Sequence, residues 1–190
     1  MPIPDRGGRP ALTSAHELAT IAQALFVERG FHETSVDDIA AAAGVSRRTF
    51  FRYFSTKTDV LWVAAPREID VFRGLLAESP PGEPWADGLC RAAARALAYP
   101  PEERPWMRQR AELFLQVPAV QEKAALRYDK WRHIATEFAR ARGVDALNAL
   151  AAGYATLAAT LAAHEYWLTH PDDDLPALLE RFLRLLLPPT

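Results

Sequence analysis

Gly44 separates two short helical segments in the run from Thr34 to Leu61, and this arrangement limits what the chain can fold into. The segment before the glycine has a helical apolar period and starts near Ser35, while the segment after it starts near Ser46. Two helices that cross steeply over so short a turn need a residue that adopts a positive φ without steric cost, and glycine does so. The run therefore predicts a helix-turn-helix.

The helix after the turn is basic and aromatic. Residues 47–57 carry four positive charges and no acid, although the whole chain has a net charge of −2. Any contact with DNA must therefore come from this local cluster, because the overall charge does not attract nucleic acid. Arginine can pair with guanine in the major groove, and threonine can contact a thymine methyl group or a phosphate. The candidate contacts on this helix are Arg47, Arg48, Thr49 and Arg52.

Three further residues are candidates for phosphate contacts. Thr34 and Ser35 stand at the start of the helix before the turn, and Lys57 stands in the first turn of the next helix. Free backbone N–H groups at a helix start can hold a phosphate together with such side chains. A basic helix can also be a solvated face. Here the turn, the caps, the charge and the aromatic spacing together favour DNA binding.

Almost every segment of the chain has a helical period, and strand signals are nearly absent. The sequence predicts an all-α fold with a flexible arm over 1–12, where Arg6 and Arg9 could reach a minor groove. A helix-turn-helix domain follows over 13–60, and a larger helical bundle over 61–190. A helix capped by Ser55 is expected to continue to about Glu78, with a kink or break at Pro66. About nine helices are expected, namely 14–30, 35–44, 46–54, 55–78, 85–99, 105–117, 118–142, 145–169 and 174–187.

The hydrophobic content of 49% is enough for a packed core. The single cysteine, Cys90, excludes an intrachain disulfide and fits a reducing cytoplasm. The N-terminus is too polar for a signal peptide. No run is expected to reach the roughly 18 apolar residues of a membrane span, because His164 and Glu165 interrupt the alanine-rich stretch near Leu157.

The last two expected helices are apolar on more than one face, so each must be covered on more than one side. One explanation is that both faces belong to the core of a single chain. The pattern favours an isologous four-helix interface between two copies, which would place two basic helices about one DNA turn apart on a palindromic site. The predicted dimer interface consists of Ala151, Ala155, Ala158, Ala162, Leu178, Phe182 and Leu186.

Two arginines, Arg110 and Arg127, occupy apolar positions of helical stripes. A buried arginine needs an acceptor. One explanation is an internal ion pair, with Glu112 or Glu137 as the candidate partner. The other is an anionic ligand that has an apolar body.

The motifs FxExGFxxTSVDDIAxxAGVS and TFFRYFxxK closely resemble the DNA-binding domain of the TetR family of bacterial regulators, over about 18–63. The resemblance implies that residues 47–54 form the recognition helix, and that Thr49, Tyr53 and Lys57 match common operator contacts. Many relatives have a phosphate-binding tyrosine where this chain has Phe51. Arg52 or Tyr53 are the candidates to replace that contact.

The segments PWMRQRAELFLQVPAVQ, LRYDKWR and AAHEYWL are similar to the C-terminal domain of an actinobacterial TetR subgroup that includes the mycofactocin-system regulators. That domain is associated with acyl-CoA-like ligands. The resemblance implies a homodimeric repressor in the bacterial cytosol, which leaves its operator DNA when an apolar or acyl-CoA-like effector binds and moves the fourth helix. The residues implied for the effector are Trp106, Arg110, Arg127, Tyr128, Trp131, Trp167 and, as a pocket histidine, His164.

No catalytic, cofactor or metal constellation is visible. His164 and Glu165 begin like a metalloprotease motif, but Leu168 stands where the second histidine would be. The other histidines have no metal-ligand spacing. Two alternatives to the repressor remain: a ligand-independent or activating DNA-binding regulator, and a helical-bundle enzyme.

Overall fold

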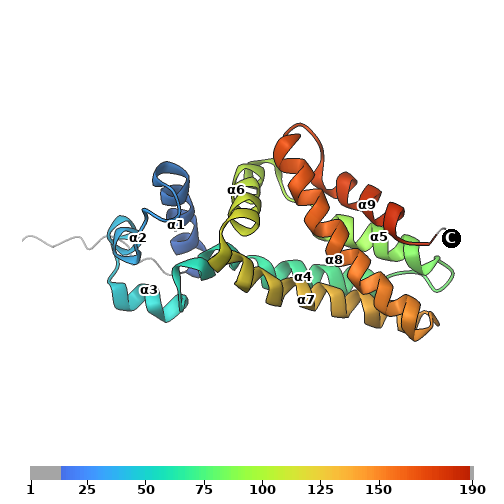
Figure 1. The fold of residues 1–190 in the computed structure, drawn as a ribbon. Coiled ribbons are helices and arrows are strands. Elements are labelled where there is room, and N and C mark those ends of the chain that lie inside the picture. The colour runs from blue at the N-terminus through green and yellow to red at the C-terminus, as the bar shows by residue number, and fades with distance from the viewer. Residues whose placement is uncertain (1–13, 189–190) are drawn as a thin grey trace, which may run out of the picture. The chain divides into compact units, whose positions relative to one another are not determined.

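The computed structural model describes residues 14–188, and these form nine α-helices and two short 3₁₀ helices (Figure 1). No strand occurs among them, which confirms the predicted all-α class. The predicted arm over 1–12, with Arg6 and Arg9, lies outside the described residues. The chain divides into two compact units, of which the first ends at Val63 and the second begins at Ala64.

The first unit contains the predicted helix-turn-helix. Ser14 and Ser35 each form a capping box, the first with Glu17 and the second with Asp38. Gly44 ends the second helix at φ 67°, in the left-handed region that the turn was expected to require. The elements of this unit are α1 (Ala15–Arg29), α2 (Val36–Ala43), α3 (Arg47–Tyr53) and the 3₁₀ helix η1 (Lys57–Trp62).

The core of the first unit fixes how α3 is turned. Ile39 of α2 and Phe50 of α3 are both fully buried, and the rings of Phe50 and Phe54 lie 5.6 Å apart. Arg48, two residues before Phe50, and Arg52, two residues after it, are exposed. Burial of the aromatic side of α3 therefore presents its arginines to solvent.

The predicted helix from Ser55 to Glu78 is wrong as one element. Thr56, rather than Ser55, precedes a 3₁₀ helix, and its backbone N–H donates to Asp59 Oδ2 at 2.7 Å. A separate helix, α4 (Ala65–Ala77), then begins. Pro66 lies in its first turn, where a missing N–H costs no intrahelical hydrogen bond, so proline starts this helix rather than breaking it.

The second unit is a helical bundle. Within it, α8 packs against α7 and α9, while α5 packs against α4 and α9 (Figure 1). The ends of its last five α-helices agree with the predictions to within three residues. The remaining elements are α5 (Trp85–Ala96), the 3₁₀ helix η2 (Pro101–Glu103), α6 (Arg104–Gln116), α7 (Pro118–Ala141), α8 (Ala146–Thr169) and α9 (Leu175–Leu186).

Helix α8 is long and apolar enough to cross a membrane by length and composition alone, with a mean hydropathy of 1.4 over an 18-residue window. The expectation that His164 and Glu165 interrupt every such window is wrong, because the 18 residues of 146–163 precede both. Core helices of soluble proteins pass the same test. Helix α8 packs against α7 and α9 as a core helix does.

Candidate functional site

Three arginines of α3 are exposed. Arg48 makes no hydrogen bond or ion pair with any residue of the described range 14–188, and its side chain is therefore available to an external partner. Arg47 Nη1 donates to Asp37 Oδ2 at 2.7 Å, in a pair whose side chains are 58% and 67% exposed. An ion pair as exposed as this one contributes at most about 1 kcal/mol to stability. A DNA phosphate can therefore replace the Asp37 carboxylate as the partner of Arg47.

Aromatic rings support two of these arginines. The guanidinium of Arg47 lies 5.3 Å from the ring centre of Phe51, which is itself 43% exposed. The guanidinium of Arg52 lies 4.9 Å from the ring centre of Tyr53 and donates to its hydroxyl at 3.1 Å. Stacking of this kind narrows the directions that a flexible guanidinium takes without neutralising its charge.

The predicted phosphate contact of Thr34 is wrong. Its side chain is fully buried and its hydroxyl donates to the Gly30 carbonyl at 2.8 Å, so it has no exposed surface with which to contact DNA. Ser35 is exposed, and its hydroxyl belongs to the capping box with Asp38. Thr49 is half-buried, with its hydroxyl 2.9 Å from that of Ser46.

Lys57 also points inward. Its ammonium donates to the carbonyl oxygens of Phe31 and Thr34, at 2.5 and 2.8 Å, and burial lowers its pKa. The ammonium also lies 4.3 Å from the ring centre of Phe31. In this structure Lys57 therefore holds the loop between α1 and α2, which is a different role from the phosphate contact that the sequence suggested.

The seven residues predicted for the effector are divided among different places in the second unit. Tyr128 lines a groove between α6, α7 and α8, Arg127 lines a groove between α4 and α7, and Trp167 lines a third, smaller pocket. The remaining four line none of these three: Trp106 is half-buried against the core, and Trp131, Arg110 and His164 are buried. The ring of Trp131 stacks on Phe72 with centroids 4.4 Å apart.

Arg110 forms a buried ion pair, but with a partner that the sequence did not suggest. Its Nη1 donates to Glu68 Oε1 of α4 at 2.7 Å, and the two side chains are 5% and 10% exposed. Both predicted partners, Glu112 and Glu137, are exposed. The Tyr99 hydroxyl completes the cluster by donating to Glu68 and accepting from Arg110.

The charges in this cluster are coupled. Burial raises the pKa of Glu68, but the Arg110 charge and the hydrogen bonds from Tyr99 and Arg110 outweigh it and leave the pKa below its ordinary value. Burial lowers the pKa of nearby His164 to about 4, so its imidazole is neutral at pH 7. His164 Nδ1 lies 2.7 Å from the Thr160 carbonyl, and we assign the proton to this nitrogen because a carbonyl can only accept.

The groove between α6, α7 and α8 has a volume of about 510 Å³, within the usual range of roughly 300–1,000 Å³ for small-molecule sites. Arg132 and Asp129 stand at it as an ion pair of 2.6 Å. The other lining residues are mainly apolar: Phe114, Leu115, Gln121, Ala124, Ala125, Tyr128, Tyr154, Leu157, Leu161 and Glu165.

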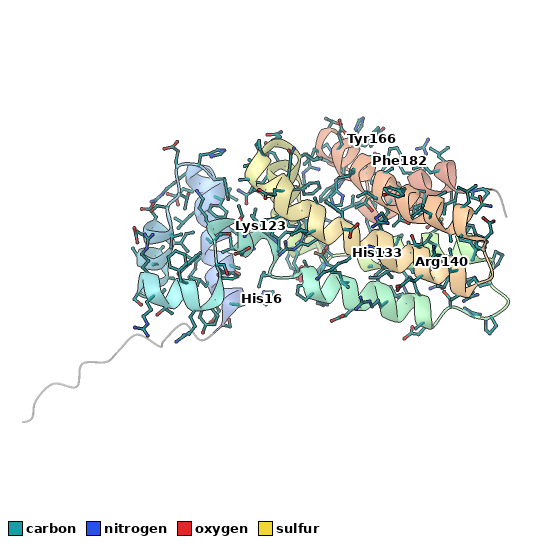
Figure 2. The ribbon with its side chains drawn as sticks, turned by 60° about the horizontal axis from the view of Figure 1, so that its bottom comes forward. His16, Lys123, His133, Arg140, Tyr166 and Phe182 are labelled. Carbon is teal, nitrogen blue, oxygen red and sulfur yellow. The ribbon has the colours of Figure 1, made fainter. Side chains whose placement is uncertain are left out.

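An apolar face of α8 and α9 is left uncovered in the single chain. Figure 2 shows Tyr166 and Phe182 close together on these helices, with ring centres 6.3 Å apart. Of the seven predicted dimer residues, Ala151, Ala158 and Leu186 are exposed, while Ala155, Ala162 and Phe182 are half-buried. Leu178 belongs to the core of the second unit instead. Four other large side chains of α8 and α9, which the prediction did not name, are also exposed: Leu147, Leu150, Tyr154 and Leu185.

Comparison with known proteins gives the family. Residues 20–62 match the model of bacterial regulatory proteins of the tetR family, and residues 83–190 match that of the MftR C-terminal domain. The chain is 32% identical to the proposed mycofactocin biosynthesis transcriptional regulator MftR of Mycobacterium tuberculosis, over 88% of this chain and 86% of the relative. The chain belongs to the TetR family. It is thus a ligand-responsive, DNA-binding transcriptional regulator, which confirms the functional class predicted from the sequence.

Two further relatives of this TetR-family chain are informative. The transcriptional activator FasR of Mycolicibacterium smegmatis is 35% identical over 66 residues, which are 34% of this chain and 30% of FasR. The structure of Thermus thermophilus FadR, a TetR-family repressor in complex with lauroyl-CoA, is 26% identical. It matches with a TM-score of 0.61 over 91% of this chain and 93% of FadR. Both relatives are transcriptional regulators by name.

Several residues of these sites were missed from the sequence of the TetR-family chain. Glu68 lies 42 positions before Arg110, so no helical spacing connects the two. Leu157 and Leu161 of α8 line the groove only because α6 and α7 pack beside them, and helical periodicity does not reveal such neighbours. Within the described residues, no group of three or more His, Cys, Asp or Glu could hold a metal ion.

Proposed function

We propose that this TetR-family regulator is a homodimeric repressor that reads a palindromic operator through α3. The observation that carries the proposal is the exposure of Arg47, Arg48 and Arg52 on a helix whose opposite side is anchored by the fully buried Phe50. A rigid basic helix of this kind fits the major groove, where arginine pairs with guanine or phosphate. Ser35, Thr49 and Tyr53 complete the proposed contact surface, and the protein acts in the bacterial cytosol.

The dimer rests on the apolar face of α8 and α9. Leu147 and Leu185 are 77% and 74% exposed, and large contiguous apolar patches mark interaction sites. A second copy of the same face would cover it in an isologous interface, with the exposed Ala151 and Ala158 allowing close approach of the helices. Two copies of α3 then read two half-sites.

This dimer is tested with Ala158→Glu, which places a charge at the centre of the proposed interface. We expect the wild type to scatter light as a dimer at micromolar concentration and Ala158→Glu to scatter as a monomer. Ala77→Glu, at an exposed position at the end of α4, is the matched control and should remain a dimer. A monomeric wild type, or a fully dimeric Ala158→Glu, would contradict the interface.

The effector site is proposed in the groove between α6, α7 and α8. Phe114, Tyr128 and Leu157 supply apolar walls for an acyl chain, and Arg132 and Gln121 supply donors for a polar group. A related regulator of 26% identity is known in complex with lauroyl-CoA, which makes an acyl-CoA-like effector the first choice here. Arg110 is not part of this site, because it does not line the groove and its side chain is buried against Glu68.

Release from DNA requires that the effector prefers a conformation that fits DNA poorly. Phe114, on the groove wall, lies one turn after Arg110 on α6, and Arg110 is paired with Glu68 of α4. Along the chain, helix α4 directly follows the first unit. We propose that an acyl chain which displaces the groove wall shifts α6, and that the ion pair passes the shift to α4.

The proposal is tested by sequencing the DNA fragments that the protein retains from a genomic digest. A palindromic motif is expected, and binding to it should weaken when lauroyl-CoA is added. Failure to enrich any motif would contradict sequence-specific binding. If the motif is bound but lauroyl-CoA neither binds nor releases DNA, the acyl-CoA effector is wrong while the operator assignment stands.

Activation rather than repression is the second candidate, favoured by the similarity of 66 residues of this chain to the activator FasR. A reporter gene behind the retained fragment separates the two. Deletion of the regulator should raise the reporter signal if the protein represses, and lower it if the protein activates.

A further inference from the structure

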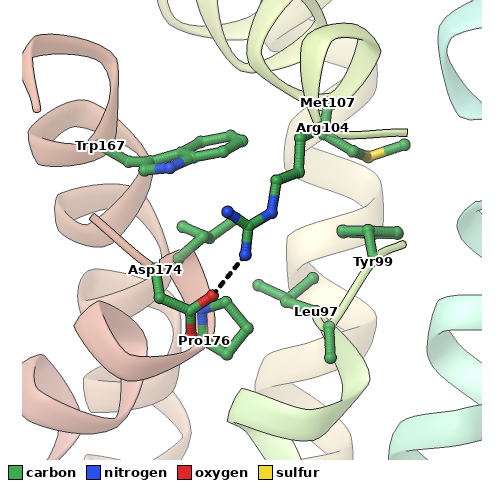
Figure 3. A pocket seen from close by; sticks show the side chains of 9 residues that line it. Leu97, Tyr99, Arg104, Met107, Trp167, Asp174 and Pro176 are labelled. Atoms are coloured by element: carbon green, nitrogen blue, oxygen red, sulfur yellow. Dashed lines mark hydrogen bonds and ion pairs between the residues drawn. The ribbon is translucent and has the colours of Figure 1, made fainter. Parts of the chain in front are cut away.

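A small pocket lies apart from the proposed effector groove and shares no lining residue with it (Figure 3). It is enclosed by the end of α5, the start of α6, the end of α8 and the start of α9, and its volume is about 180 Å³. The lining residues are Leu97, Ala98, Tyr99, Arg104, Met107, Trp167, Asp174, Leu175 and Pro176. This volume is below the roughly 300 Å³ at which drug-sized sites begin, so only a small molecule fits.

The apolar walls of this pocket are already ordered. Leu97, Met107 and Trp167 are each 3% exposed. The indole Nε1 of Trp167 donates to the Asp173 carbonyl at 3.0 Å. Arg108 also holds Trp167 in place. Its guanidinium lies 5.0 Å from the ring centre of Trp167 and donates to the Trp167 carbonyl at 2.7 Å. A wall held in this way does not have to be immobilised when a ligand binds, which removes part of the entropic cost of binding.

A guanidinium is the polar group at the centre of the pocket. Figure 3 shows the side chain of Arg104 extending between Trp167 and Leu97, with one hydrogen bond from Nη2 to Asp174 Oδ1 at 2.9 Å. Its remaining N–H groups have no acceptor among residues 14–188. A guanidinium matches a carboxylate through two parallel hydrogen bonds, and here a single one is used.

Asp174 can give up Arg104 at little cost. The two side chains are 47% and 49% exposed, and half-exposed ion pairs are weak. The other carboxylate oxygen of Asp174, Oδ2, accepts from the Ala177 backbone N–H at 3.2 Å as the N-cap of α9. The aspartate therefore keeps a partner after it leaves the arginine.

We propose that this pocket binds a small monocarboxylic acid with an apolar body. The carboxylate of the ligand takes the place of Asp174 on Arg104, and its body packs against Trp167, Met107 and Leu97. The position of Asp174 marks where an external carboxylate sits. The ligand class differs from the acyl-CoA-like effector of the larger groove, and the site does not depend on the proposed repressor function.

The test is calorimetric titration of the full-length protein with benzoate and with its uncharged counterpart benzamide, at about 0.15 M salt, where charges farther apart than about 8 Å are screened. Benzoate should bind at least about tenfold more tightly than benzamide, because only benzoate carries a negative charge and two acceptor oxygens for the Arg104 guanidinium. Equal affinities for the two, or no heat with benzoate up to about ten millimolar, would overturn the proposal.

Two variants with opposite expected effects keep the test specific. Arg104→Gln should weaken benzoate binding at least about tenfold. Asp174→Asn should strengthen it by up to about fivefold, since it removes the competing carboxylate while asparagine still caps α9. Arg140→Gln, at an exposed arginine of α7 (Figure 2), should leave the affinity unchanged.

Each variant must unfold at the wild-type temperature for its affinity to be compared. If Arg104→Gln folds and binds benzoate like the wild type, or if Asp174→Asn weakens binding, Arg104 is not the carboxylate partner and the site is refuted. Operator binding, measured on the same samples, reports separately on the proposed repressor function.

Discussion

The arginines of α3 in the first unit and Arg110 in the second unit differ in their exposure to solvent. In the first unit, Arg47, Arg48 and Arg52 are exposed. Arg47 and Arg52 each make one exposed hydrogen bond and stack on one ring. In the second unit, Arg110 is buried and bonded to Glu68 and Tyr99. An exposed guanidinium can exchange its partner for a phosphate at little cost, whereas a buried one cannot leave its carboxylate uncompensated. The contrast separates arginines that act on external partners from an arginine that holds the bundle together.

The largest effect is expected where the buried pair is broken. Arg110→Met leaves the Glu68 carboxylate buried without its counter-charge and should lower the free energy of unfolding by about 3–5 kcal/mol. The double variant Glu68→Leu with Arg110→Met removes both charges and should recover most of that loss. Urea unfolding measures both, with Arg48→Ala as the exposed control within about 0.5 kcal/mol of the wild type. A single variant as stable as Arg48→Ala would break the comparison.

The buried His164 gives a pH dependence. Its pKa of about 4 lies below the ordinary value of 6.5, so below pH 6.5 the unfolded chain takes up a proton that the folded chain does not. Stability should therefore fall as the pH falls, by about 2 kcal/mol between pH 7 and pH 5. His164→Gln should remove this slope in urea titrations at the two pH values, while the exposed His133→Gln should keep it. Parallel slopes for the wild type and His164→Gln would show that another group is responsible.

Lys57 tests whether a cation of the first unit can have a structural role like that of Arg110, since its ammonium points inward. Lys57→Met removes two hydrogen bonds to the carbonyls of Phe31 and Thr34 and should lower the free energy of unfolding by about 1–2 kcal/mol. The exposed Lys130→Met is the control in urea unfolding. An unchanged stability of Lys57→Met would return Lys57 to the set of free DNA-contacting cations.

The helix-turn-helix of the first unit was predictable because its determinants are local. Ser35, Gly44 and Ser46 act within one turn of their own positions, and the structure has the caps and the positive φ that they implied. The second unit was predictable in its helices but not in its sites. The partner of Arg110 is 42 residues away, and the groove and the Arg104 pocket exist only where helices distant in sequence meet. Helical periodicity identifies apolar faces, but not the neighbour that covers each face.

The central claim is that α3 reads operator DNA through its exposed arginines. The most direct measurement is the affinity for the retained operator fragment over a range of salt concentrations, for the wild type and for Arg48→Ala. We expect Arg48→Ala to bind at least about tenfold more weakly. The slope of log affinity against log salt should fall by about one if the lost contact is to a phosphate. Stability should not change. Equal affinity and equal slope for the two proteins at physiological salt would contradict the account.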